Sequence, residues 1–173
     1  MRSSLWVALA LVGCHADTAR PVFSPLPESA GTEIRLSPRE ATRQLAEALR
    51  ADSLPVRKVL LRDAYLETGW FDVKTGQRRS SPMGPNIVQV RAWADPARPG
   101  SALLSVETTY RPLADPSLPE RELDRQVPGK HPVAVKVDSV LQRMVRRFGG
   151  PPPPQAPTQT PSATPAPEPS DDQ

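Results

Sequence analysis

Cysteine and histidine are scarce in this chain: among 173 residues there are one cysteine, Cys14, and two histidines, His15 and His131. A single cysteine excludes an intramolecular disulfide, and it excludes a zinc site built from several thiolates at short spacing. Two histidines so far apart in the sequence do not supply the missing ligands. We therefore expect no metal and no other cofactor.

No segment is apolar over a length that spans a bilayer. The apolar run at residues 5–12 contains eight residues, whereas a membrane-crossing helix needs about 20. Hydrophobic residues make up only 38% of the chain, and prolines number 23. This composition is typical of chains that are partly disordered, so we expect one folded domain between two tails.

The middle of the chain carries an excess of positive charge. Residues 33–148 contain 20 lysines and arginines against 14 aspartates and glutamates, and most of the cations are arginines. Such an excess is typical of proteins with anionic partners, and it is equally typical of a GC-rich genome, in which arginine codons are frequent. We favour the second interpretation and expect no nucleic-acid partner.

The first residues have the layout of a secretory signal peptide. Arg2 supplies a positive start, the apolar run at residues 5–12 follows, and the small residues Gly13 and Cys14 close it. We therefore predict a signal peptide over residues 1–13 that is removed from the mature protein.

The sequence Leu-Val-Gly-Cys at residues 11–14 resembles the lipobox of bacterial lipoproteins. The resemblance implies a diacylglyceryl group on the sulfur of Cys14, cleavage after Gly13, and acylation of the new amino end, for example with palmitate. Two or three acyl chains hold a protein stably on a membrane, whereas one holds it only marginally. The alternative is an ordinary signal peptide that is cut after Ala16 and takes the cysteine with it.

The residue that follows the predicted lipidation site is His15 and not an aspartate. In the sorting pattern of enterobacterial lipoproteins, this resembles an outer-membrane destination. We therefore expect a protein of the cell envelope that is anchored by lipid in the outer membrane and faces the periplasm.

Two proline-bearing tails flank the predicted domain at residues 33–149. Residues 14–32 contain three prolines and show little periodicity, so we predict a lipidated, extended tether. Residues 150–173 contain nine prolines, four of them consecutive. This second tail is expected to be disordered and to favour polyproline II.

Two segments have the apolar spacing of amphipathic helices. The first is predicted at residues 38–52, where Ser37 and Glu40 form a capping box and Pro38 suits the first helical position. The second is predicted at residues 132–148, where valine, leucine, methionine and phenylalanine form one apolar stripe and arginines lie on the other faces.

Three segments predict strands. Residues 56–71 are rich in side chains that favour a pleated surface, with a bend or interruption expected near residues 63–64. Apolar positions alternate at residues 86–95 and 101–111, and the short link between them predicts a β-hairpin. The charged connection at residues 112–130 is longer than most loops, which is typical of functional or disordered segments.

The order helix, three strands, helix predicts an α+β fold. We expect a two-layer sandwich, in which a three-stranded antiparallel sheet packs against an N-terminal and a C-terminal helix. This arrangement buries all the apolar stripes against one face of the sheet.

The candidate contacts with a partner are an aromatic pair and two groups of arginines. The sequence Leu-Glu-Thr-Gly-Trp-Phe at residues 66–71 resembles a strand of BamC-like envelope lipoproteins, which take part in outer-membrane assembly. The alternative is that Trp70 and Phe71 belong to the core and to a strand edge. Four arginines suit anionic groups on a membrane or a partner, and the alternative for them is a solvated face; they are Arg78, Arg79, Arg146 and Arg147.

No motif predicts an enzyme. His131 has no nucleophile or carboxylate motif beside it, so we expect a histidine at a helix start or in a loop. Glu120, Glu122 and Asp124 alternate with arginines. Paired carboxylates serve glycosidases, but the alternating signs favour a solvated segment.

The sequence therefore predicts a lipid-anchored envelope protein whose domain binds another envelope protein as a non-enzymatic scaffold, as an accessory of outer-membrane assembly or transport. The first alternative is a binder of lipid or of another small apolar ligand between sheet and helices. The second alternative is a cell-wall-active enzyme such as a hydrolase. A solid core with an exposed aromatic or arginine patch favours the scaffold, and an open cleft with converging polar groups favours the alternatives.

Overall fold

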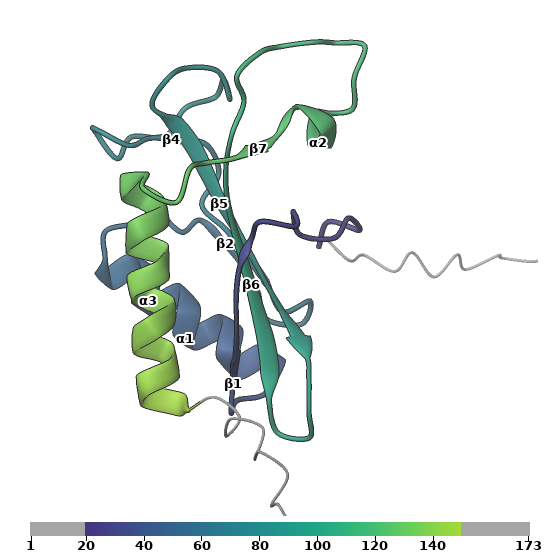
Figure 1. The fold of residues 1–173 in the computed structure, drawn as a ribbon, viewed down its shortest axis with the longest axis vertical. Helices are drawn as coiled ribbons and strands as arrows, with labels where there is room; N and C mark the ends of the chain where they lie inside the picture. The colour runs from purple at the N-terminus through teal and green to yellow at the C-terminus, as the bar shows by residue number, and fades with distance from the viewer. Residues whose placement is uncertain (1–19, 150–173) are drawn as a thin grey trace, which may run out of the picture.

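The computed structural model describes residues 20–149, which form a sheet with two long helices on one side (Figure 1). The predicted α+β class with an antiparallel sheet is confirmed. Within this range the sheet has seven strands, so the predicted number of three is wrong, and a third, short helix is present besides the two that were predicted. Cys14, the predicted signal peptide and the tail at residues 150–173 lie outside the described residues.

In chain order the elements are β1 (Ala30–Ile34), α1 (Pro38–Ala51), β2 (Lys58–Leu60), β3 (Tyr65–Glu67), β4 (Phe71–Asp72), β5 (Ile87–Pro96), β6 (Ala102–Tyr110), α2 (Glu120–Leu123), β7 (Arg125–Gln126) and α3 (Pro132–Phe148).

The strand predicted at residues 56–71 consists of three short strands. β2 and β3 pair antiparallel, with Val59 opposite Leu66. The chain reverses between them through Ala64, whose φ of 49° lies in the left-handed region. A residue with a Cβ adopts this conformation at a cost of about 1 kcal/mol, and the Ala64 carbonyl is held by the Ala94 N–H at 2.9 Å. The expected bend is therefore a complete reversal of the chain.

The sheet also takes strands from segments predicted as tether and loop. β1 begins at Ala30 and pairs with β6, so the sheet starts before Glu33, the predicted first residue of the domain. The predicted loop at residues 112–130 contains α2 and β7, and β7 also pairs with β6. Since β5 occupies the other side of β6, β1 and β7 lie along the same edge of this strand. Both strands are short and have prolines in the flanking sequence, so the alternation of apolar and polar residues does not reveal them.

The order along the sheet is β1-β6-β5-β3-β2, with β4 paired to β5, and all pairs between these strands are antiparallel. α1 and α3 lie on the same side of this sheet (Figure 1). The alternate apolar positions of β5 and β6 belong to the core, where Val90, Leu104 and Val106 are fully buried. Burial of each such side chain stabilises the fold by about 1.5–3 kcal/mol.

The two long helices begin at the residues predicted for them. α1 starts at Pro38, after Ser37, whose Oγ accepts the Glu40 N–H at 3.4 Å. α3 spans Pro132–Phe148, and the prediction of a histidine at a helix start is confirmed, because His131 is its N-cap. The buried stripes have the spacing of helices packed on one side; they comprise Ala41, Leu45 and Leu49 in α1, and Val133, Val137, Val140, Leu141 and Met144 in α3.

The cap of α3 is expected to depend on pH. His131 Nδ1 accepts the Val133 N–H at 3.3 Å, and only an unprotonated ring nitrogen accepts a hydrogen bond. Burial lowers the pKa of His131 below its ordinary value of 6.5, so the unfolded chain binds the proton first as the pH falls. The stabilisation by the neutral ring is therefore complete above about pH 6.5 and is lost as the pH falls through the lower pKa of the folded protein.

A comparison with His131→Asn tests this cap, because asparagine caps helices and does not titrate. We expect the urea midpoint to fall more steeply in the wild type than in the variant between about pH 7.5 and about pH 5.5. The carboxyl groups titrate in both proteins, so their contribution to the pH dependence of the midpoint is the same and does not affect the difference between the two. Equal slopes in the two proteins would contradict this role of the ring.

Candidate functional site

The face of the sheet that points away from the helices, which we call the second face, is polar and buried. Alternate positions of β5 and β6 put Gln89, Arg91 and Glu107 on this face, and the register sets Arg91 directly opposite Glu107. Glu107 is fully buried and Arg91 is 7% exposed. A buried charge is costly unless it is paired and hydrogen-bonded, so the second face has to provide partners for both groups.

Five charged side chains meet on the second face, and we call them the charged cluster: Arg91, Glu107, Arg111, Arg121 and Asp124. Arg91 bridges two carboxylates, since its Nη1 lies 3.3 Å from Glu107 Oε1 and its Nη2 lies 2.8 Å from Asp124 Oδ2. Arg111 Nε donates to Asp124 Oδ1 at 2.7 Å. Arg121 donates to both oxygens of Glu107, at 2.7 and 2.9 Å. Every carboxylate oxygen of the cluster therefore accepts a charge-assisted bond from an arginine.

Two members of the cluster come from the connection that was predicted to be solvated. Asp124 follows α2 and is 2% exposed, and Arg121 lies within α2. The prediction of a solvated segment is therefore wrong for these two residues. Glu122 is exposed, and Glu120 is exposed but lies 3.0 Å from Arg111 Nη2. Some of the alternating charges at residues 120–125 therefore bond to the buried polar face that the chain crosses, and others point to solvent.

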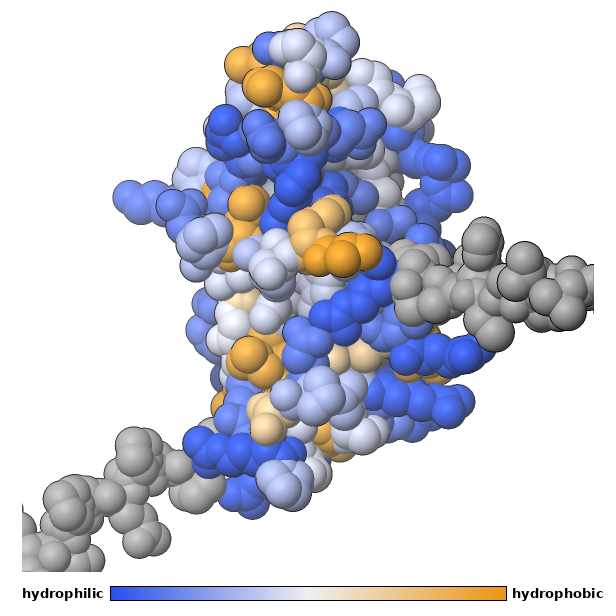
Figure 2. Space-filling model, turned by 90° about the vertical axis from the view of Figure 1, so that its right-hand side faces the viewer, coloured by the Kyte–Doolittle hydropathy of each residue, from blue (hydrophilic) through white to orange (hydrophobic). Residues whose placement is uncertain are grey.

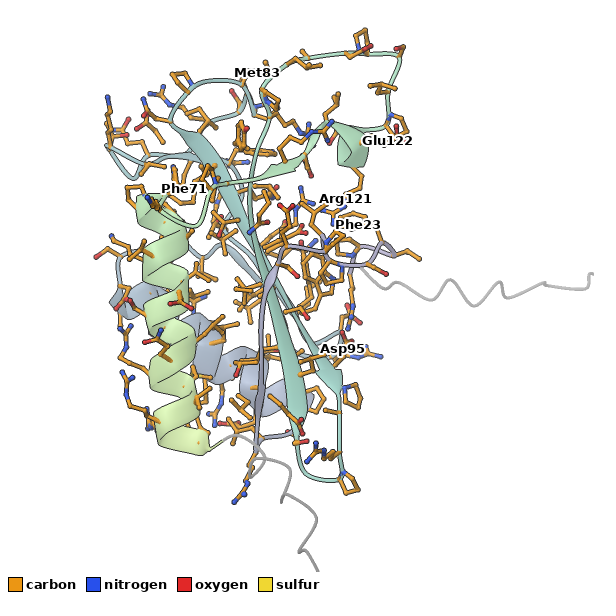
Figure 3. All side chains as sticks on the ribbon, in the orientation of Figure 1. Phe23, Phe71, Met83, Asp95, Arg121 and Glu122 are labelled. Carbon is orange, nitrogen blue, oxygen red and sulfur yellow. The ribbon has the colours of Figure 1, made fainter. Side chains whose placement is uncertain are left out.

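Residues 20–29, which were predicted as part of an extended tether, lie against the second face. The Phe23 ring meets the Trp93 ring edge-on, with 6.0 Å between the centroids, and the Arg121 guanidinium lies 4.2 Å from the Phe23 centroid. Figure 3 shows Phe23 and Arg121 close together on the side away from α1 and α3. Such a cation–π contact stabilises by about 0.5–2 kcal/mol.

Main-chain groups of the same segment are bonded to the charged cluster. The Leu26 N–H donates to Glu107 Oε2 at 3.2 Å. Arg121 Nη2 donates to the Ser24 carbonyl at 2.8 Å. The cluster therefore holds the N-terminal segment both to β6, through Glu107, and to the connection that contains α2, through Arg121.

A cavity of about 210 Å³ remains beside the cluster, and its lining is mainly charged and polar. On its wall the Tyr65 hydroxyl donates to Glu67 Oε2 at 2.5 Å. Burial, together with this carboxylate, raises the pKa of Tyr65 well above its ordinary value of 10, so the phenol stays protonated. Pockets for small ligands usually have volumes of about 300–1,000 Å³, and this cavity is smaller.

The candidate contact residues lie in three different settings. Phe71 is 3% exposed and belongs to the core on the helix side. Trp70 is half-buried, and the guanidinium of Arg111 lies 5.0 Å from its ring centroid. The exposed arginines lie at opposite ends of the molecule (Figure 1): beside β4 are Arg78 and Arg79, and at the end of α3 are Arg146 and Arg147.

A further concave surface lies between the free edge of β1 and α3. Two depressions of about 500 and 570 Å³ share Ala30 and Asp138 in their lining, and we call them together the β1 groove. The first depression is also lined by Gly31, Leu141, Val145 and Arg146, and the second by Glu28, Gln126 and Val135.

Hydrophilic side chains dominate the side of the molecule seen in Figure 2, with hydrophobic ones scattered between them. Among residues 20–149, no three or more His, Cys, Asp or Glu side chains are placed to hold a metal ion. No helix in the described part of the chain is long and apolar enough to cross a membrane.

Sequence reasoning missed the charged cluster, although one signal for it is present. Trp93 shares its face of β5 with Gln89 and Arg91, whereas the apolar core positions occupy the other face. A tryptophan among the polar positions of a strand indicates that this face is covered, since large aromatic side chains are mostly buried. Together with the unusually long connection at residues 112–130, this points to a buried polar interface.

Removal of one charge from the cluster is expected to destabilise the whole domain. Asp124→Asn keeps the shape of the side chain but leaves two buried arginines without a full counter-charge. Breaking a buried ion pair in this way costs about 3 kcal/mol, which should appear as a lower midpoint of urea unfolding.

The matched control is Arg43→Ala, whose ion pair with Glu40 lies on the exposed face of α1. We expect its midpoint to equal that of the wild type, because exposed ion pairs contribute little. In Asp124→Asn the Leu26 amide should also exchange its proton faster, since the segment over the cluster is loosened. If Asp124→Asn unfolds at the same urea concentration as the control, the cluster does not hold the domain together.

Neither a scan against models of protein families nor a search among curated proteins finds a match for this chain. No relative therefore names a ligand, a partner or a reaction for it. The resemblances to a lipobox and to BamC-like lipoproteins depend only on residues 11–14 and 66–71, respectively.

Proposed function

We propose that the protein is a lipid-anchored lipoprotein of the cell envelope, whose domain binds another envelope protein and catalyses no reaction. Its anchor is the lipid on Cys14, and its place is the periplasmic side of the outer membrane. Its role is that of an accessory in outer-membrane assembly or transport. The sheet layer and the helix layer together serve as a rigid platform for the partner.

The observation that carries the proposal is the attachment of the chain to the sheet six residues after Cys14. Arg20 Nη2 lies 2.6 Å from Asp95 Oδ1, and its Nη1 donates to the Asp63 carbonyl at 3.2 Å. Six residues span at most about 22 Å when fully extended. A lipid on Cys14 would therefore hold the second face within that distance of the membrane.

This attachment also supports a defined orientation. The chain enters the domain on the side of the sheet away from α1 and α3 (Figure 1). The sheet would then lie between the membrane and the two helices, while the β1 groove at the sheet edge would stay open to the side. Such an orientation offers the groove and the helices to a partner in the periplasm.

The charged cluster supports a binding role over a catalytic one. Glu107 and Asp124 have all their carboxylate oxygens bonded to arginines, and a general base needs a free lone pair that reaches the substrate. The cavity beside the cluster, of about 210 Å³, is also small for a lipid or another ligand. The cluster is therefore better suited to hold chain segments in place.

A comparison of the wild type with Cys14→Ser tests the anchor. We expect the intact mass of the wild type to show the loss of residues 1–13 and the addition of a diacylglyceryl group and an acyl chain. The variant should remain an unprocessed and unacylated precursor. If Cys14→Ser is processed and held on membranes like the wild type, the lipoprotein proposal is wrong.

The orientation is tested with fluorophores on single introduced cysteines, because Cys14 is blocked by lipid. Val22 and Val135 are 99% and 50% exposed, the first on the N-terminal segment and the second on α3. We expect energy transfer to an acceptor in the lipid headgroups to be stronger from Val22→Cys than from Val135→Cys. Equal transfer from both sites in lipid-anchored protein would contradict the orientation but not the anchor.

A further inference from the structure

The free edge of β1 exposes main-chain groups that point away from the sheet. The Val127 N–H donates to the Thr108 carbonyl at 2.9 Å, so the even-numbered residues of β6 direct their backbone groups toward β1 and β7. The register pairs these residues with the even-numbered residues of β1. The backbone N–H and C=O groups of Gly31 and Glu33 therefore point outward, where no strand of the described chain pairs with them.

The chain itself leaves the domain beside this edge. The next outward donor, the Arg35 N–H, bonds to the Gly149 carbonyl at 3.2 Å. Residues 151–154 are four prolines, and a run of prolines has no N–H groups to donate to a strand. This part of the chain is therefore a poor partner for Gly31 and Glu33, whose carbonyls require donors.

The β1 groove offers two further kinds of contact next to the edge. Leu141, Val145 and Val135 present apolar surface along it. The Gln126 side chain also lines it, and its buried Oε1 has no hydrogen-bond partner among the described residues. An extended chain suits this surface, because it combines main-chain hydrogen bonds with side chains that alternate between two faces.

Charges of opposite sign mark the two ends of the groove. Arg146 lines the depression nearer the end of α3, and Arg35 is exposed at the same end of β1. Glu28 lines the other depression, and Asp138 lies where the two depressions meet. A strand antiparallel to β1 passes Arg146 first and Glu28 last, so its matching charges are acidic near its N-terminal end and basic near its C-terminal end.

We propose that the β1 edge and the β1 groove bind an extended segment of a partner protein as an added antiparallel strand. The segment alternates apolar and polar side chains, with an acidic residue before them and a basic residue after them. This inference rests on the proposed binding function, which it deepens by naming the surface and the form of the partner. It does not involve the lipid on Cys14, so either idea can fail without the other.

The probe for this site is the peptide acetyl-Glu-Val-Thr-Val-Thr-Val-Lys-amide, added to the protein as it is purified from cells, in detergent micelles, whether or not it carries a lipid. We expect the Gly31 and Glu33 amides to become protected from hydrogen exchange when the probe binds. The reversed peptide, acetyl-Lys-Val-Thr-Val-Thr-Val-Glu-amide, should bind about threefold more weakly, because exposed charge pairs each contribute a few tenths of a kcal/mol.

Two substitutions at one position separate the backbone bond from the side chain. Gly31→Pro removes the outward donor, and proline is tolerated where an edge strand turns its N–H to solvent. Gly31→Ala keeps the donor, and its Cβ would lie 3.6 Å from the nearest atom, the Leu104 carbonyl oxygen, at ordinary contact distance. We expect Gly31→Pro to weaken probe binding about five- to tenfold, as for the loss of one hydrogen bond, and Gly31→Ala to leave it unchanged.

Four results would overturn the proposal. The first is a lack of protection at Gly31 and Glu33 at millimolar probe, and the second is equal binding by Gly31→Pro and Gly31→Ala. The third is protection without probe that rises with protein concentration, which would assign the edge to a second copy of the chain. The fourth is protection without probe that disappears when residues 150–173 are deleted, which would assign it to the chain's own tail.

Discussion

The guanidinium of Arg91 bonds to two buried carboxylates, and the second face of the sheet depends on this bridge. Glu107 belongs to β6 and Asp124 to the connection after α2, so one side chain of β5 joins β6 to a connection that the sheet itself holds only through the two-residue strand β7. Taking these charges out of water is costly, and the cost is offset only when every donor and acceptor is matched. Arg111 supplies a second arginine to Asp124, and Arg121 supplies a second arginine to Glu107.

The bridge explains why the sheet has two different faces. On the helix side, apolar side chains are buried by non-directional contacts that tolerate small shifts. On the second face, the same strands bury charges whose hydrogen bonds require one geometry. The N-terminal segment is included in this geometry through the Leu26 N–H and the Ser24 carbonyl. A segment rich in proline, with few apolar side chains, is thereby held in one place without a strand of its own.

The parts that the sequence predicts are those whose signal is local. α1, α3 and the hairpin of β5 and β6 follow from apolar periodicity, and their bounds agree with the structure to within about two residues. The reversal at Ala64 has no glycine or proline to mark it, and β1 is hidden behind the prolines that precede it. The charged cluster is not local at all: Arg91 and Asp124 are 33 residues apart, and alternating charges at 120–125 have the same pattern whether solvent or a buried arginine faces them.

The cluster and the β1 groove are connected through β6 and the chain that precedes β1. Glu107 lies one residue beyond Val106, which pairs with Ala30, and the Ser29 N–H closes a turn on the Leu26 carbonyl at 2.9 Å. The segment fastened by Glu107 therefore sets where β1 begins. A strand added to β1 would in turn restrict β1 and the turn before it, which favours the docked form of the N-terminal segment. Because binding free energies are reciprocal, the docking of the N-terminal segment on the charged cluster and a partner strand on the β1 edge would stabilise each other.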